Sequence, residues 1–92
     1  MSKVLVRNVT NTSILGSKVQ GENLSKLILD TINRDAEVEV DFAGITNMAI
    51  EPVLAAFKPF IDDFGKEVIG TLIKITAPGN MLKDMNRVLG VS

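Results

Sequence analysis

The residues of this chain that could do chemistry gather between two carboxylates, Asp41 and Glu51. Thr46 and Asn47, with a hydroxyl and an amide, lie between them, and Pro52 follows. The segment begins where an apolar strand pattern ends, and Pro52 suits the first position of a helix. Ligands and partners of α/β proteins often bind just beyond the carboxyl ends of the strands. We therefore expect the candidate site on this loop and on the helix start after it.

Each polar residue of this segment has a structural interpretation beside the functional one. A carboxylate such as Glu51 at a helix amino terminus is favoured by about 0.3–1 kcal/mol. Asp41 is expected to bond backbone amides in the loop around Gly44, and Thr46 and Asn47 to satisfy the same loop. The functional hypothesis is contact with a partner, through seven residues: Asp41, Thr46, Asn47, Met48, Ile50, Glu51 and Val53.

Other kinds of site are excluded or disfavoured. The chain has no cysteine and no histidine, which rules out thiolate catalysis, imidazole metal sites and a Ser-His-Asp triad. Asp62, Asp63 and Glu67 could suggest a metal, but neighbouring side chains on a helix diverge by about 100°. We interpret them as a solvated face. Because no pair of acid and base converges, we expect a protein that is not an enzyme and uses no metal or cofactor.

The 92 residues indicate a single domain, 1–92, and 46% of them are apolar, which suffices for a core. Ten basic and eleven acidic residues give a net charge of −1. We expect no nucleic-acid partner, because such a partner requires a basic surface. The lack of a signal-peptide pattern or a long apolar run predicts a cytoplasmic protein with no membrane partner. The near-zero net charge favours self-association, and a homodimer is one expectation.

The hydrophobic pattern predicts alternating strands and helices. Val4 and Val6 suit an opening strand, and residues 8–13 could close a hairpin onto Ser13–Leu15. Ser17 and Gln20 match a capping box, which predicts a helix over about 18–34. Apolar and acidic residues alternate over 36–42, as in a strand with one polar face.

The second half repeats this alternation. A helix is expected from Pro52 to Gly65, with a core stripe that includes Phe57, Phe60 and Phe64. Pro59 lies inside it and predicts a kink or a break. Residues 68–76 suit a second long strand, and Asn80 is expected to cap a third helix that Gly90 ends. Pro78 and Gly79 before it form an ordinary turn.

The predicted fold class is therefore α/β, with a small mixed, mostly parallel sheet of about four strands and three helices. Strands that alternate with helices imply right-handed crossovers and parallel pairing. The opening hairpin would add an antiparallel edge.

This order of elements, together with Asp41-Phe42-Ala43-Gly44-Ile45-Thr46, resembles the STAS domain, the fold of bacterial anti-sigma factor antagonists. That run is similar to the family's Asp-Leu-Ser-Gly-Val-Thr, and closer still to the Asp-Phe-x-Gly-Val pattern of a STAS-like family without an assigned function. Ser17 stands where the family often has an acidic helix start. Nearly the whole chain is covered, including the Pro78-Gly79-Asn80 turn and the helix after it. The resemblance implies a regulatory protein-interaction module whose partner is a kinase-type ATPase or another regulator.

The chain departs from this family at one informative place. Phospho-switched members carry Asp-Ser-Ser-Gly after the strand, and a kinase phosphorylates a serine there. The aligned residues here are Ala49-Ile50-Glu51-Pro52. Glu51 therefore stands where the acceptor serine would be, and phosphorylation at that position is excluded. Glu51 could instead resemble the phosphorylated state, although one carboxylate is a poor copy of a phosphate.

Two alternatives stay open beside the interaction module. One is a small-ligand or nucleotide-binding domain that uses the turn after Asp41 and the helix start at Pro52. The other is a self-associating structural unit whose opening strand is an exposed edge that pairs with its copy.

Overall fold

The computed structural model describes residues 2–91, which form an α/β globule. The elements run in the order β1 (Ser2–Leu5), α1 (Val6–Thr10), β2 (Ile14–Leu15), α2 (Lys18–Asp35), β3 (Val38–Asp41), β4 (Asn47–Met48), α3 (Ile50–Phe64), the 3₁₀ helix η1 (Lys66–Val68), β5 (Ile73–Thr76) and α4 (Met81–Leu89). The capping box at the start of α2 is confirmed, since the Ser17 hydroxyl accepts from the Gln20 amide at 3.2 Å and Gln20 Oε1 accepts from the Ser17 amide at 3.1 Å.

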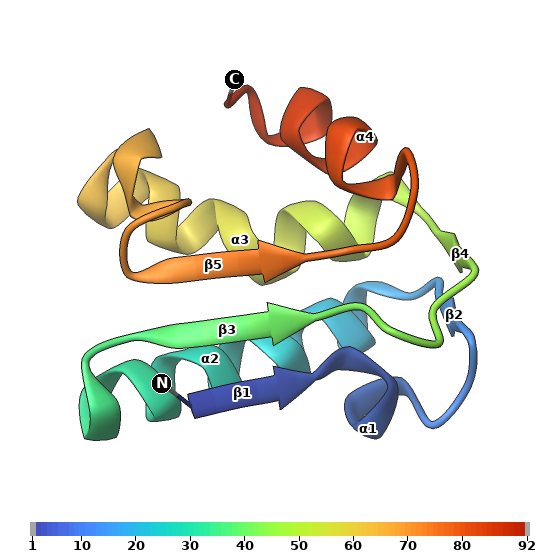
Figure 1. Cartoon of the computed structure of the whole chain (residues 1–92), viewed down its shortest axis with the longest axis horizontal. Coiled ribbons are helices and arrows are strands. Elements are labelled where there is room, and N and C mark those ends of the chain that lie inside the picture. The colour runs from blue at the N-terminus through green and yellow to red at the C-terminus, as the bar shows by residue number, and fades with distance from the viewer. Residues whose placement is uncertain (1, 92) are drawn as a thin grey trace.

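All named strands within residues 2–91 pair in parallel. The larger sheet has the order β1-β3-β5, with Val4 beside Val40 and Val40 beside Ile75 (Figure 1). The smaller sheet pairs β2 with β4, with Ile14 beside Asn47. The expected mixed sheet of about four strands is therefore wrong in detail: the structure has separate three-stranded and two-stranded sheets, and four α-helices in place of three.

The predicted opening hairpin is also wrong. Residues after β1 turn into the short helix α1, whose Val6 and Thr10 face the core one helical turn apart. Asn11 ends this helix in the left-handed conformation at φ 59°, which asparagine tolerates better than most residues. The chain continues beyond α1 to β2, which pairs in parallel with β4 and not with β1.

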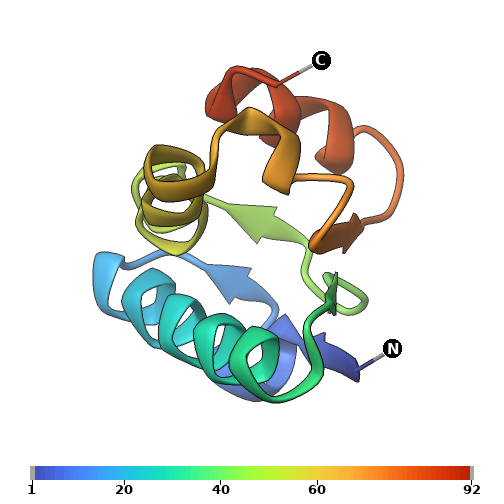
Figure 2. The same cartoon turned by 90° about the vertical axis from the view of Figure 1, so that its left-hand side faces the viewer.

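Two similar units build the molecule. Each consists of a strand of the larger sheet, a short strand of the smaller sheet and a long helix, namely β1-β2-α2 and β3-β4-α3. Corresponding strands pair with each other. The two long helices lie side by side on one face of the three-stranded sheet (Figure 2). As a result, the amino termini of α2 and α3 lie at the same end of the molecule (Figure 1).

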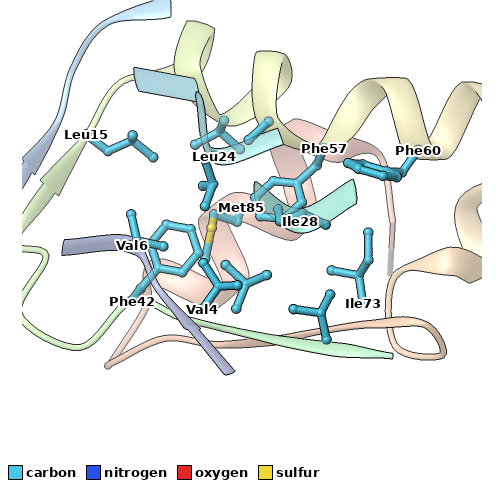
Figure 3. Close-up of a cluster of buried hydrophobic side chains, with 14 of the residues drawn as sticks. Val4, Val6, Leu15, Leu24, Ile28, Phe42, Phe57, Phe60, Ile73 and Met85 are labelled. Carbon is cyan, nitrogen blue, oxygen red and sulfur yellow. The ribbon is translucent and has the colours of Figure 1, made fainter. Parts of the chain in front are cut away.

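The core lies between this helix pair and the sheet (Figure 3). Val4, Val40 and Ile73 rise from the strands, while Leu24 and Ile28 of α2 come from the other side. The rings of Phe42 and Phe57 meet with centroids 6.4 Å apart. Helix α4 closes the core with two residues that were predicted to face inward, Met85 and Leu89.

A glycine allows the two long helices to approach closely. A Cβ atom at Gly21 would lie 2.8 Å from the Cα and 2.9 Å from the carbonyl carbon of Pro52. Real Cβ atoms do not come so near to backbone atoms. Glycine at this position makes α2 less stable by roughly 1 kcal/mol than alanine would. The close contact with Pro52 explains why glycine is nevertheless present, since no larger residue fits there.

Helix α3 differs from its prediction at two residues, Pro59 and Phe64. It begins at Ile50 and continues through Pro59 to Phe64, so of the kink or break expected at Pro59, the break does not occur. Pro59 is exposed, and on the exposed side of a helix water can satisfy the carbonyl group that loses its partner. Phe57 and Phe60 are buried as expected, but Phe64 is 57% exposed and does not belong to the core.

The strand predicted over 68–76 is shorter than expected. It is interrupted by η1 and by a turn at Gly70, whose φ of 98° is incompatible with a strand, and β5 starts only at Ile73. Helix α4 ends at Gly90, as expected. Asn80 precedes α4, but within the described residues its side chain makes no capping hydrogen bond. Instead, the Met81 amide bonds the Pro78 carbonyl oxygen at 3.2 Å.

The face of the larger sheet that α2 and α3 leave uncovered is polar. Lys3 Nζ lies 3.9 Å from Glu39 Oε2 and 3.7 Å from Asp41 Oδ2, and the Thr76 hydroxyl donates to Glu39 at 3.1 Å. This confirms the polar face predicted for β3. No helix in residues 2–91 has the length and apolar character that crossing a bilayer requires.

The Gly21 contact leads to a stability prediction. Gly21→Ala should destabilise the fold by about 1–3 kcal/mol, because overpacking outweighs the gain in helix propensity. Urea unfolding monitored by circular dichroism measures this change. Ser25→Ala, on the same helix, is the control and should change stability little. A Gly21→Ala variant as stable as its parent would show that the helices are not held at this distance.

The carboxylate at the end of α2 leads to a pH prediction. A hydrogen bond from the Ser2 hydroxyl, and then one from Arg34, lower the pKa of Asp35 from its ordinary value of 3.8. Because the pKa of Asp35 is lower in the folded chain than in the unfolded chain, its ionised carboxylate stabilises the fold at any pH above the pKa of the unfolded chain. This contribution is lost as the pH falls through the pKa of the folded chain. Ser2→Ala should raise the pKa of Asp35 toward 3.8, measured by carboxyl-carbon NMR titration. An unchanged pKa in that variant would contradict the assignment.

Candidate functional site

The predicted site begins with a tight turn after β3. Asp41 Oδ1 accepts the Ala43 amide at 2.9 Å, and the Ile45 amide bonds the Phe42 carbonyl oxygen at 3.0 Å. Gly44 takes a φ of 84° in this turn, a conformation that favours glycine. The structural role predicted for Asp41 is therefore confirmed. Its side chain lies on the polar face of the sheet, where Oδ2 is 3.7 Å from Lys3 Nζ.

The next residues are held by the first half of the chain. The Ser13 carbonyl oxygen accepts the Thr46 amide at 2.7 Å, the Asn47 amide at 3.3 Å and the Thr46 hydroxyl at 3.3 Å. The Ala49 amide bonds the Leu15 carbonyl oxygen at 2.9 Å. These bonds flank the parallel pairing of β2 with β4. The loop is consequently fixed in place while the side chains of Thr46 and Asn47 remain exposed.

The start of α3 divides its residues between surface and core. Ile50 is 63% exposed, which is high for a large apolar side chain. Glu51 is exposed in the first helical turn, where a carboxylate is favoured by the free amides. Val53, by contrast, is only 1% exposed and belongs to the core, although it also lines the groove that the exposed loop residues border.

A groove of about 790 Å³ lies between this loop and α4, and we call it the β4–α4 groove. Thr46, Asn47, Met48 and Ile50 line it on one side. On the other side it is lined by residues of the last turn and helix: Pro78, Gly79, Met81, Asp84, Arg87 and Val88. The groove has half-buried apolar residues and a charged rim, where Arg87 Nη1 lies 3.8 Å from Asp84 Oδ1.

A second groove of about 1010 Å³ runs between the two long helices, and we call it the α2–α3 groove. Val19, 62% exposed, and Ile50 lie at one end of it. Charged side chains of both signs stand along it: Lys18, Glu22, Lys26, Glu51, Lys58 and Asp62. Ile50 and Glu51 thus belong to this groove, and Ile50 also lines the β4–α4 groove.

Polar and charged groups at these surfaces are limited to the side chains that line the two grooves and their neighbours. Residues 2–91 contain no group of three or more carboxylates that could hold a metal ion. In the same range every buried side-chain nitrogen or oxygen has a hydrogen-bond partner. Asp62 pairs with Lys58 at 3.3 Å on the exposed side of α3. The described surface therefore offers apolar contacts with a polar rim.

Sequence reasoning missed the half of the β4–α4 groove that α4 contributes. Met81 was predicted to be core, and Asp84, Arg87 and Val88 attracted no functional hypothesis. A local signal for this groove is absent from the sequence because its two walls lie some thirty residues apart in the chain. The chain matches no family model, no curated protein and no solved structure.

The Asp41 turn leads to a prediction that separates the hydrogen bond of this side chain from its negative charge. Asp41→Ala removes the acceptor for the Ala43 amide and should destabilise the fold by about 1 kcal/mol. Asp41→Asn keeps a carbonyl oxygen at that place and should retain most of the stability. Chemical denaturation of both variants measures the difference. If Asn is as damaging as Ala, the negative charge and not the hydrogen bond is what the site requires.

Proposed function

We propose that this chain is a non-enzymatic, STAS-like interaction module of the cytoplasm that docks a protein partner in the β4–α4 groove. The supporting observation is that Thr46, Asn47, Met48 and Ile50, predicted as partner contacts, line one groove together with α4. Protein interfaces commonly have an apolar centre and a polar rim, and the groove has both. Met48 and Met81 add side chains that adapt readily to the shape of a partner.

The resemblance to anti-sigma factor antagonists supplies the class of partner in this proposal, namely a kinase-type ATPase or another regulator. Fold-level analogy is a weak argument for function, so the proposal depends on the groove. Since Glu51 replaces the family's acceptor serine, the partner binds without a phosphorylation step at that place.

A matched pair of variants tests the groove. Ile50→Asp and Val19→Asp place a charge on side chains of almost equal exposure, 63% and 62%, each in the first turn of a helix. Only Ile50 lines the β4–α4 groove. In pull-downs from the native lysate, Ile50→Asp should lose a discrete partner that the parent and Val19→Asp both retain. Capture of the same partner by all three proteins would place the interface elsewhere.

A second pair tests the other wall of the groove. Arg87→Glu reverses a charge on its rim, whereas Lys83→Glu reverses a charge on the same helix outside it. We expect Arg87→Glu alone to weaken partner binding, by about tenfold, because a reversed rim charge slows association with the partner. Titration of the purified partner by calorimetry measures this, and circular dichroism confirms that both variants fold. Equal affinities for the two variants would contradict a role for α4.

The volume of the groove favours one second candidate, a small-ligand or nucleotide-binding domain. About 790 Å³ falls within the range of small-molecule sites, roughly 300–1,000 Å³. A ligand present at a hundred times its dissociation constant should stabilise the fold by about 2.7 kcal/mol. Thermal shifts with nucleotides and simple anions measure this. A shift that Ile50→Asp abolishes would favour the ligand site over the protein dock.

A further inference from the structure

We infer that the α2–α3 face binds a second copy of this chain, with the long helices of the two copies antiparallel. This surface is distinct from the proposed dock in the β4–α4 groove. It contains Val19 and Ile50, the two most exposed large apolar residues within the described chain. Its six charged residues are three lysines and three carboxylates, so the face has no net charge of its own. A neutral face with charges of both signs suits its own copy better than a strongly charged partner.

The charges along the two helices are arranged so that a two-fold axis brings opposite signs together. On α2, Glu22 is followed four residues later by Lys26, and on α3, Glu51 is followed seven residues later by Lys58. A two-fold axis that crosses both helices at right angles reverses these orders in the second copy. Glu22 then faces the partner's Lys26, and Glu51 faces the partner's Lys58.

One axis can serve both helices because of the Gly21–Pro52 contact. The middle of the Glu22–Lys26 pair lies three residues beyond Gly21, which is about 4.5 Å along α2. The middle of the Glu51–Lys58 pair lies two and a half residues beyond Pro52, which is about 3.8 Å along α3. Both midpoints therefore lie at nearly the same height, and four opposite-charge pairs form around a single axis.

The same arrangement covers exposed apolar surface. Ile50 lies about 3 Å before Pro52 along α3, and reversal about the axis places it against the partner's Pro59. Leu54 and Ala55, both half-buried, lie at the axis itself. Within residues 2–91, Glu22, Lys26 and Glu51 make no ion pair in the single chain. Association therefore gives them partners without breaking existing ones, and only Lys58 must share its charge with Asp62.

The face is about 20 Å wide, because two adjacent helices are each about 10 Å across. It is about 22 Å long, which is the length of the 15 residues of α3. Interfaces of this size associate weakly. We therefore expect a dimer that forms at micromolar to millimolar concentration and loosens as salt screens the pairs. Since Ile50 belongs to both grooves, dimer formation would restrict access to one end of the β4–α4 groove.

Charge exchange on α2 tests the dimer without touching the β4–α4 groove. Glu22→Lys or Lys26→Glu alone places like charges opposite each other and should weaken self-association by about tenfold or more. The double variant Glu22→Lys/Lys26→Glu restores opposite charges and should associate as the parent does. A mixture of the two single variants should also associate, because each then meets the opposite sign. Sedimentation equilibrium against the monomer mass of 9.9 kDa measures each case.

The outcomes are decisive for the arrangement. Loss in the single variants with recovery in the double variant and in the mixture supports the antiparallel dimer, and circular dichroism checks that each variant folds. A parent that is monomeric at its highest soluble concentration overturns the inference. A double variant as weak as the single ones overturns it too, as does association of the single variants at parental strength. Partner capture through the β4–α4 groove, measured at protein concentrations below those at which the parent dimerises, should be unchanged in all of them, because Glu22 and Lys26 do not line that groove. Failure of one proposal is therefore distinguishable from failure of the other.

Discussion

The close contact between Gly21 and Pro52 is the constraint on which the rest of this structure depends. It joins α2 to α3 near their amino termini and leaves no room for a side chain between them. The strands that precede these helices, β2 and β4, pair in parallel at the same end of the molecule. The loop between β3 and α3 is therefore held through β2 and α2 as well as by the hydrogen bonds of its own turn, and its exposed side chains stand on a fixed backbone.

Two surfaces result from this arrangement, and Ile50 lies where they meet. The β4–α4 groove combines the loop with a helix from the end of the chain, and the α2–α3 groove combines the faces of the two long helices. The first suits a protein partner and the second a further copy of the chain in the account proposed above. Because both use the start of α3, occupation of one surface affects the other. In this proposal, self-association and partner binding compete for the start of α3 without any phosphorylation step.

Sequence reasoning succeeded where local chemistry determines structure and failed where distant segments meet. The capping box of Ser17, the alternation in β3 and the glycine at the end of α4 each depend on neighbouring residues, and all were predicted correctly. The hairpin was wrong because β2 pairs with β4, a strand more than thirty residues away in the chain. Helix α1 was missed because its five residues are too few to show a helical period. The site was predicted in part: the loop was found from the strand end before it, but the wall formed by α4 depends on tertiary packing.

Native-state hydrogen exchange at the Thr46 and Ala49 amides tests most directly whether the helix pair holds the loop. These amides bond the carbonyl oxygens of Ser13 and Leu15. We expect them to open only together with the core of α2, with the same free energy of opening as the amide of buried Ile28, since loop and helix form one cooperative unit. Exchange of both loop amides at a much lower free energy than that of Ile28 would contradict it, because the loop would then open independently of the helices.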